Sequence, residues 1–516
     1  MPNYDYDVIV IGGGAAGLTA AKCARGFNKK VAIIEHDRLG GECTWTGCIP
    51  SKTLIHSAHI AHSIKNAQRF GIKNATTFDT SDVMQHVRAT VQEVYSSHSP
   101  EQLEKCGITV LKGHPVFLDS HHIQLDHLSL PQPTYKTSTD TAMLGRTGKK
   151  IRFCKAIIAT GSSPSTPDIK GIDSVPYLTN QTVFDLEVLP KSMIILGAGA
   201  IGIELASAFN RLGVSITLVQ KNERILPQDD YELTDMLRGV MENEGVIIKT
   251  GMRAYSVMQD LSGIPFDKRS GVNAATTGNH GIKVLANDIS HATHEFVAET
   301  LLVATGRKPN VHEFGLENAD VHFDNDGIKV DEYLRTTSAN IFACGDVVGP
   351  YRFSHMAWYQ AVTATGNAAL PWFKKKIDYT NKLWVTFSAP ELATSGLTEQ
   401  EARQQYGNSV MVYRASYAEL DRAHTDGATV GMGKFVLDKK GRIIGAQILG
   451  KNAGEIMSQL QVAKVNGVKF ADLYKVLYAC PTMSQLVWLA AKKAYMDRLQ
   501  NNFFIRIAKK IMGIFN

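Results

Sequence analysis

The chain of 516 residues is poor in cysteine and has no long apolar segment. Its seven cysteines are too few for a secreted protein held together by disulfides, so we expect a reducing, cytoplasmic setting. No uncharged apolar run reaches the roughly 18–20 residues that a membrane-spanning helix needs. The N-terminal segment does not resemble a signal peptide, because Asp5 and Asp7 interrupt it.

Excess charge is also scarce outside the C-terminal end. From Lys492 onward there are six basic residues and one acid, so this segment carries nearly all of the formal net charge of +6. The nearly neutral remainder excludes a broad nucleic-acid surface, and we predict no nucleic-acid partner. A composition of 44% apolar and 20% charged residues is typical of a globular protein, and the length indicates several domains.

The N-terminal segment contains a dinucleotide-binding pattern. An apolar strand runs into GGGAAG at 12–17, a helix follows, and a second strand ends at Glu35. In such a pattern Gly12 allows a tight turn, Gly14 lets the backbone approach a pyrophosphate, and Gly17 lets the helix pack on the strand. Glu35 comes where a carboxylate would bind ribose hydroxyls.

A second pattern of this kind begins about 185 residues later, with GAGAIG at 197–202. Gly197, Gly199 and Gly202 take the three glycine positions. Two such loops imply that one chain binds two dinucleotides, and hydride transfer between them is the natural inference.

The second pattern lacks the acid. Gln220 stands where the first pattern has Glu35, and Lys221 and Arg224 follow. Loss of the acid beside basic residues favours a 2′-phosphate, so we predict NADPH with NADH as the other candidate. Lys221 and Arg224 could also be ordinary solvated side chains.

A pair of cysteines follows the first pattern, in the segment GGECTWTGCIPSK at 40–52. Four residues separate Cys43 from Cys48, which suits a small redox loop better than the two-residue spacing usual in zinc sites. No second Cys-x-x-Cys motif accompanies the pair. If the first dinucleotide is FAD, the pair would stand close to the flavin.

This segment resembles the active-site signature of the class I pyridine nucleotide–disulfide oxidoreductases, which include lipoamide dehydrogenase, glutathione reductase and mercuric reductase. The resemblance implies an α/β fold with two Rossmann-like domains, for FAD and NAD(P)H, and a C-terminal α+β dimerisation domain in a homodimer. Four further motifs carry it: ATG at 159–161, ATGR at 304–307, IFACGD at 341–346, and the stretch from Pro390-Glu391 to Thr398.

The resemblance also suggests where the domains lie. We predict an FAD-binding domain at 1–189, an NAD(P)H-binding domain at 190–314, a segment completing the FAD domain at 315–380, and an interface domain at 381–516. Two polar stretches, 119–150 and 260–295, are predicted to be loops or hairpin extensions.

By the same resemblance, Cys48 is the thiolate that contacts the flavin and Cys43 exchanges with substrate. Lys52 would lie near the reactive flavin nitrogen, paired with Glu204. A nearby lysine and a helix N-terminus both lower a thiol pKa, and a buried ammonium group needs a carboxylate. The remaining residues that the resemblance assigns to cofactors are Thr160, Gly161, Asp346, Met356 and Ala357 for FAD and Gly306 for NAD(P)H.

The pattern departs from the family near the C-terminus. Disulfide reductases of the family carry His-Pro-Thr-x-x-Glu here, whereas this chain has Cys480 in place of the histidine and Gln485 in place of the glutamate. A histidine can take and return a proton at neutral pH, and a cysteine backed by a glutamine does this poorly. Efficient turnover of lipoamide or glutathione is therefore not expected.

Two interpretations of Cys480 stay open. In a dimer it could form, with Cys43 and Cys48, a transient set of three soft ligands for Hg(II), Cu(I) or another thiophilic ion. It could equally be a small buried residue in a site that has left disulfide chemistry.

The leading hypothesis is an FAD enzyme that passes electrons from NAD(P)H through flavin to Cys43 and Cys48, and on to a thiophilic metal ion or an unusual disulfide. Residues 420–427 resemble the mercuric-reductase-like branch, although the C-terminal cysteine pair of mercuric reductases is absent. One alternative is a dihydrolipoamide dehydrogenase subunit of a 2-oxo acid dehydrogenase complex. Another is a membrane-edge flavoprotein with a quinone or oxygen acceptor.

The end of the chain, about 500–516, has an amphipathic and basic pattern. Such a helix lies on an anionic membrane surface, here the inner face of a membrane, or packs its apolar side on the dimer. The apolar side consists of Phe504, Ile507, Ala508, Ile511 and Phe515.

Overall fold

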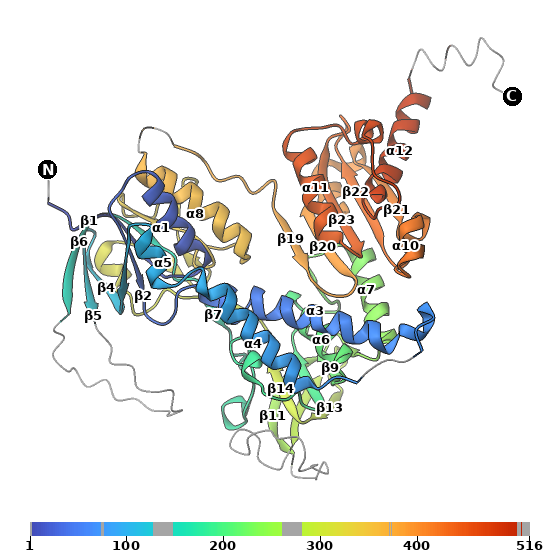
Figure 1. Ribbon diagram of the computed structural model, residues 1–516, viewed down its shortest axis with the longest axis horizontal. Coiled ribbons are helices and arrows are strands. Elements are labelled where there is room, and N and C mark those ends of the chain that lie inside the picture. Colours follow the sequence, from blue (N-terminus) through green and yellow to red (C-terminus); the bar gives the residue numbers. More distant parts are fainter. Residues whose placement is uncertain are drawn as a thin grey trace.

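A computed structural model of the chain describes residues 3–73, 77–126, 148–260, 281–370, 372, 374–502 and 507. Most of the predicted loops at 119–150 and 260–295 and of the C-terminal segment lies outside the described residues. Figure 1 shows three units, which lie at the left, at the bottom and at the upper right of the view. Within the described residues, no helix is both long and apolar enough to cross a membrane.

The first unit is built on a mainly parallel sheet with the order β3-β2-β1-β6-β5-β4, in which β18 also pairs with β6. Its central strands are continuous apolar runs because both faces of the sheet are covered. Helices α1 (Ala15–Gly26) and α8 (Ser354–Ala369) pack together on one face. The strands are β1 (Tyr6–Ile11), β2 (Val31–Glu35), β3 (Ile108–Lys112), β4 (His114–Asp119), β5 (His122–Asp126), β6 (Lys149–Ile158) and β18 (Ile341–Ala343).

The second unit repeats this design with the parallel sheet β10-β9-β8-β14 and helices α6 (Ala200–Arg211) and α7 (Tyr231–Asn243). An antiparallel sheet, β11-β12-β13, completes the unit. The short strands β7 and β15 pair with each other where the chain passes from the first unit to the second and where it returns. The strands are β7 (Ser162–Pro164), β8 (Ser192–Leu196), β9 (Ser215–Val219), β10 (Ile247–Lys249), β11 (Arg253–Asp260), β12 (Gly281–Asn287), β13 (Thr293–Ala298), β14 (Thr300–Val303) and β15 (Arg307–Pro309).

The third unit is an antiparallel sheet with the order β19-β20-β23-β22-β21, covered by helices around its own apolar core. Its strands are β19 (Leu383–Thr386), β20 (Glu391–Gly396), β21 (Met411–Ser416), β22 (Met432–Leu437) and β23 (Ile443–Gly450). Its helices are α9 (Glu399–Tyr406), α10 (Asp421–Thr425), α11 (Ala453–Val465) and α12 (Gln485–Gln500).

The helix that carries the second cysteine joins the first two units. This helix, α3 (Cys48–Lys65), lies along α6, and their apolar residues share one core (Figure 1). The cysteine segment is thereby held between the two sheets.

The remaining elements are α2 (Gly41–Trp45), α4 (Thr80–Ser96), α5 (Pro100–Lys105), β16 (Phe323–Asp324), β17 (Gly327–Ile328), and the 3-10 turns η1 (Ala67–Phe70), η2 (Ile172–Ser174), η3 (Val183–Asp185), η4 (Leu316–Ala319), η5 (Gly407–Ser409), η6 (Tyr417–Glu419) and η7 (Phe470–Lys475).

The fold class predicted from the sequence is confirmed: two Rossmann-like units precede an α+β unit. The predicted domain limits at 189, 314 and 380 stay predictions.

Candidate active site

A cavity of about 1540 Å³ runs between the first and second units. Its lining includes Gly12 and Glu35 of the first unit, the cysteines Cys43 and Cys48, and Gly199, which precedes α6. Ligand pockets for drug-sized molecules measure about 300–1,000 Å³, so this cavity is large enough for a dinucleotide.

The two glycine loops have matching backbones. Gly12 and Gly197 have φ angles of +100° and +102°, and a Cβ at either position would collide with a backbone carbonyl of the facing strand end. A Cβ at Gly199 would meet nothing within 4 Å, and at Gly14 only a Cα at 3.8 Å. Each loop thus leaves an open backbone face at a helix N-terminus, which fits a pyrophosphate.

The third glycines pack rather than line the cavity. A Cβ at Gly17 would strike the carbonyl of Gly12, and one at Gly202 would strike that of Gly197. At both positions the absence of a side chain lets helix and strand come close together.

Glu35 is held as a carboxylate at the end of β2. Its Oε2 accepts a hydrogen bond from the Gly13 N–H at 2.6 Å, and its Oε1 accepts one from the Asp37 N–H at 2.8 Å. Burial raises the pKa of Glu35, but hydrogen bonds from His36 and these backbone groups outweigh it and hold the pKa below its usual value. A charged acceptor for ribose hydroxyls fits this place.

Cys43 and Cys48 are adjacent free thiols whose pKa values are shifted in opposite directions. Cys48 is the first residue of α3, and its Sγ lies 3.2 Å from the Ser354 Oγ. The hydrogen bond from the Cys43 thiol lowers the pKa of Cys48 to about 6 against the effect of burial, with help from Ser354 and the Lys52 ammonium group. The same bond and burial raise the pKa of Cys43. These opposite directions make Cys48 the thiol of the reduced pair that ionises first.

Lys52 lies one turn farther along α3 and pairs with Glu204 of α6. The Lys52 Nζ is 2.8 Å from the Glu204 Oε2, and the carboxylate side chain is only 8% exposed. The second oxygen, Oε1, accepts the Phe387 N–H at 2.9 Å, and the ammonium group stands 4.5 Å from the centre of the Phe387 ring. This satisfies a buried carboxylate that would otherwise be costly to the fold.

Replacing Ser354 by alanine is expected to raise the pKa of Cys48 by about one to two units, because a hydrogen bond to a charged group contributes about 1.5–3 kcal/mol. The measurement uses flavin-loaded protein in a Cys43→Ser background, where Cys48 cannot form a disulfide. A thiolate that touches oxidised flavin gives a long-wavelength absorption band, and its midpoint pH reports the pKa. An unchanged midpoint would show that Ser354 contributes nothing.

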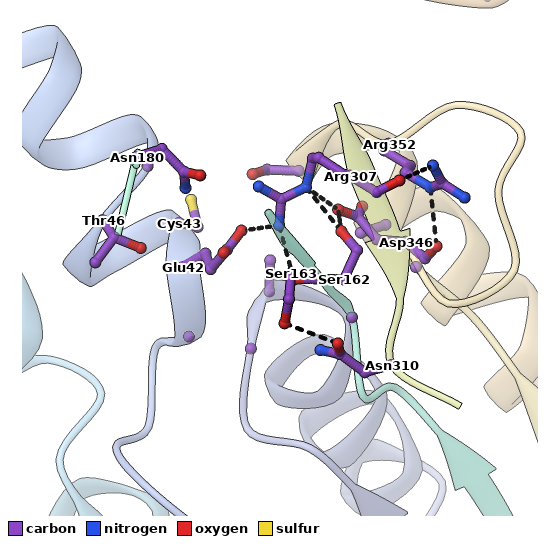
Figure 2. A pocket seen from close by; sticks show the side chains of 18 of the residues that line it. Glu42, Cys43, Thr46, Ser162, Ser163, Asn180, Arg307, Asn310, Asp346 and Arg352 are labelled. Carbon is purple, nitrogen blue, oxygen red and sulfur yellow. Dashed lines mark hydrogen bonds and ion pairs between the residues drawn. The ribbon is translucent and has the colours of Figure 1, made fainter. Parts of the chain in front are cut away.

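Arg307 connects the cysteine segment to Asp346 (Figure 2). Its guanidinium group is ion-paired with Glu42, the residue before Cys43, and lies 3.6 Å from the Asp346 carboxylate. It also donates to the Ser162 Oγ at 2.8 Å, and this hydroxyl donates to Asp346 at 2.7 Å. Glu42, Ser162 and Arg307 all line the cavity, and no role was predicted for them from the sequence.

The structure brings most of the predicted site residues into the cavity. Those that line it are Gly12, Gly14, Glu35, Cys43, Cys48, Lys52, Thr160, Gly161, Gly199, Glu204, Gly306, Asp346 and Ala357. Those that do not are Gly17, Met356, Gly197, Gly202, Gln220, Lys221, Arg224 and Cys480. The roles predicted for all of them stay predictions.

The predicted 2′-phosphate residues lie beyond β9. Gln220 is buried, and its side-chain amide donates to the Arg224 carbonyl at 3.4 Å. The Arg224 guanidinium group donates to the Pro227 carbonyl at 2.9 Å and lies 5.5 Å from the ring centre of Tyr231. Lys221 is exposed. The preference for NADPH remains a prediction.

Cys480 is exposed in the segment between η7 and α12. The Gln485 side chain bonds to its own segment: its oxygen accepts a hydrogen bond from the Thr482 N–H at 3.2 Å. Within the described part of this chain, no cluster of three or more His, Cys, Asp or Glu side chains could hold a metal ion.

The fold and cavity define a class of protein: an oxidoreductase with two dinucleotide sites and a dithiol between them. The sequence profile of the pyridine nucleotide-disulphide oxidoreductases matches residues 6–366, and that of their dimerisation domain matches residues 383–491. The chain belongs to the pyridine nucleotide-disulphide oxidoreductase family, whose members are enzymes that use FAD and NAD(P)H. The dimerisation domain supports a homodimer.

Named relatives fall into two groups. A mercuric reductase of Bacillus cereus is 30% identical over 491 residues, covering 95% of this chain and 71% of that protein. A dihydrolipoyl dehydrogenase of Bacillus subtilis (strain 168) is 29% identical over 491 residues, covering 95% and 98%. The solved Cu(II) complex of the HOCl-induced flavoprotein disulfide reductase RclA from Escherichia coli has a TM-score of 0.79 at 24% identity, covers 96% of this chain and 100% of that one, and shows the shared fold.

Proposed function

We propose that this enzyme passes electrons from NAD(P)H to Cys43 and Cys48 and from them to a thiophilic metal ion or an unusual disulfide. FAD bound in the cavity would supply the two-electron transfer between the nicotinamide and the cysteines. The observation that carries the proposal is the Cys48 thiol on the cavity wall, with a pKa lowered to about 6.

In the second half of the reaction, the cysteine pair supplies the two electrons that the acceptor takes up. Oxidation of the Cys43–Cys48 dithiol to a disulfide releases two electrons and its bound protons. A divalent ion such as Hg(II) accepts both electrons and becomes the neutral metal, whereas a disulfide accepts two electrons and two protons. The metal route needs no acid to deliver protons to the acceptor.

This difference favours a metal acceptor. Cys480 and Gln485 stand where disulfide reductases of this type carry their proton-shuttling pair, and a thiol is a soft ligand. One group of relatives is named for mercuric ion, and the similarly folded RclA was solved as a Cu(II) complex. Leu477, three residues before Cys480, is 98% exposed, which suits a segment that a second subunit covers.

Anaerobic titration with NADPH, and separately with NADH, tests the proposal. We expect a long-wavelength band on two-electron reduction, followed by loss of the band when mercuric chloride is added. The reductant that acts at lower concentration identifies the preferred nucleotide. Flavin reduction without the band would mean that the cysteines stand outside the electron path, and the proposal would fall.

Replacing Cys480 by alanine is expected to lower Hg(II)-dependent NADPH oxidation about tenfold, because loss of a group that supports a metal site costs roughly 10–100-fold in affinity or activity. Flavin reduction by NADPH should be unchanged. Cys106→Ala, which removes another exposed thiol, is the control. Equal rates of Hg(II)-dependent NADPH oxidation in both variants would show that Cys480 is only a small structural residue.

Dihydrolipoamide oxidation is the second candidate, because relatives at 29% identity carry the name dihydrolipoyl dehydrogenase. A lipoamide assay separates the two candidates. Turnover of dihydrolipoamide faster than that of Hg(II) would favour the second.

A further inference from the structure

The strand β19 and the residue after it contact two parts of the candidate site: the start of α8 and the Lys52–Glu204 pair. It is the edge strand of the third unit and reaches toward α3 (Figure 1), and its residues Leu383 and Val385 line the cavity. The interactions around it involve groups on both sides of Cys48.

On one side β19 holds the start of α8. The Leu383 carbonyl lies 2.5 Å from the His355 Nε2, and the Trp384 ring is parallel to that of Phe353, with centres 6.1 Å apart. Phe353 and His355 flank Ser354, whose hydroxyl contacts the Cys48 sulfur. Both neighbours of the hydroxyl-bearing residue are therefore fixed to the strand.

On the other side, the residue after β19 fixes the ammonium group. The Phe387 N–H donates to Glu204, which pairs with Lys52 through its other oxygen, and the Phe387 ring faces the same ammonium group. Ser354 and Lys52, two of the groups that stabilise the Cys48 thiolate, thus depend on one strand.

The strand itself is tied to the second unit by a buried acid. Asp229 precedes α7 and is only 6% exposed. Its Oδ1 accepts the Trp384 Nε1–H at 2.8 Å and the Thr394 hydroxyl at 2.6 Å. A buried indole N–H and a buried carboxyl group each satisfy the other here. The bond fixes the ring that packs against Phe353.

We propose that Asp229 and Trp384 are positioning residues for the Cys48 thiolate and act through β19. Neither touches the sulfur. Their hydrogen bond fixes the position of β19. The strand in turn fixes the positions of Ser354 and of the Lys52–Glu204 pair. The inference rests on the role proposed for the Cys48 thiolate, but not on the identity of the electron acceptor.

The test is Trp384→Phe, which keeps an aromatic ring against Phe353 and removes the N–H. Flavin-loaded protein in the Cys43→Ser background is titrated, and the long-wavelength band is followed against pH. We expect the midpoint to rise by at least about half a unit, which is a roughly twofold loss of the band at the reference midpoint pH. Thermal unfolding and flavin content of each variant show that it is folded and loaded.

Two variants test the route. Asp229→Asn keeps an oxygen that accepts from Trp384 and should leave the midpoint at the reference value. Thr394→Val removes the other donor to Asp229 and should do the same. A midpoint unchanged in Trp384→Phe, or shifted equally by Thr394→Val, overturns the inference.

The reference protein separates the two proposals. A reference that shows no band at any pH contradicts the proposed function and this inference together. If the flavin-loaded Cys43→Ser protein shows the band and Trp384→Phe does not change the midpoint pH of that band, the inference alone is contradicted.

Discussion

Cys48→Ser is expected to abolish NADPH-dependent reduction of Hg(II) while NADPH still reduces the flavin. A serine hydroxyl in the same place cannot form the disulfide that stores and releases two electrons. We expect acceptor turnover to fall by about 10³-fold or more, the scale on which catalytic groups that act as a unit fail. The measurement is anaerobic stopped-flow, with flavin reduction and acceptor-dependent NADPH oxidation followed separately.

The comparison variant is Cys106→Ser, which changes an exposed thiol outside the cavity. It should behave as the unaltered enzyme in both half-reactions. If Cys48→Ser still reduced Hg(II) at near-normal rates, electrons would leave the flavin without the cysteines. The quinone or oxygen acceptor considered in the sequence analysis would then become the better hypothesis.

The parts of the site that could be predicted are those with a local sequence signal. The loops at 12–17 and 197–202 sit between strand and helix patterns, and only glycine fits where a side chain would strike backbone. Glu35 and the cysteines lie in the same first 50 residues, so their positions follow from one βαβ unit and its continuation. Tertiary packing changes such short-range geometry little.

The rest depends on contacts between distant segments. Ser354 is 306 residues from Cys48, and Arg307 is 265 residues from Glu42. Ser354 has a signal only in retrospect, since it opens α8, the helix that carries the predicted FAD residues Met356 and Ala357. Asp229 and Trp384 have none, because their partnership exists only once the second and third units are packed together.

The junction between these two units also contains a buried group of charges. The Lys434 side chain on β22 is 4% exposed, and its Nζ lies 2.8 Å from both the Asp230 Oδ1 and the Glu232 Oε2, and 3.3 Å from the Glu399 Oε2. Arg414 pairs with the same Glu232 and Glu399. One buried ammonium group therefore faces three carboxylates, of which Asp230 is itself buried.

Lys434→Met is expected to lower the free energy of unfolding by about 3–5 kcal/mol, because it leaves a buried carboxylate without its cation. Calorimetry should show a clearly lower thermal midpoint. Lys376→Met is the matched control: its pair with Glu332 is 2.6 Å long but more than half exposed on both sides, and such pairs contribute about 0–1 kcal/mol. Similar losses in both variants would show that burial of the charge does not matter here.

The effect of Lys434→Met should depend on pH in a definite direction. Burial alone would raise the pKa of Glu232 and of Glu399, but Lys434 and arginine neighbours outweigh it and hold both below the usual 4.5. A lowered pKa gives stability that is present above pH 4.5 and is lost as the pH falls through the folded-state pKa. The pKa of Lys434 is raised above 10.5 by its carboxylates against the effect of burial, so its share is lost only at higher pH. The difference between the two proteins should therefore be largest from about pH 5 to 10 and shrink in acid; a difference that grows in acid would contradict this account.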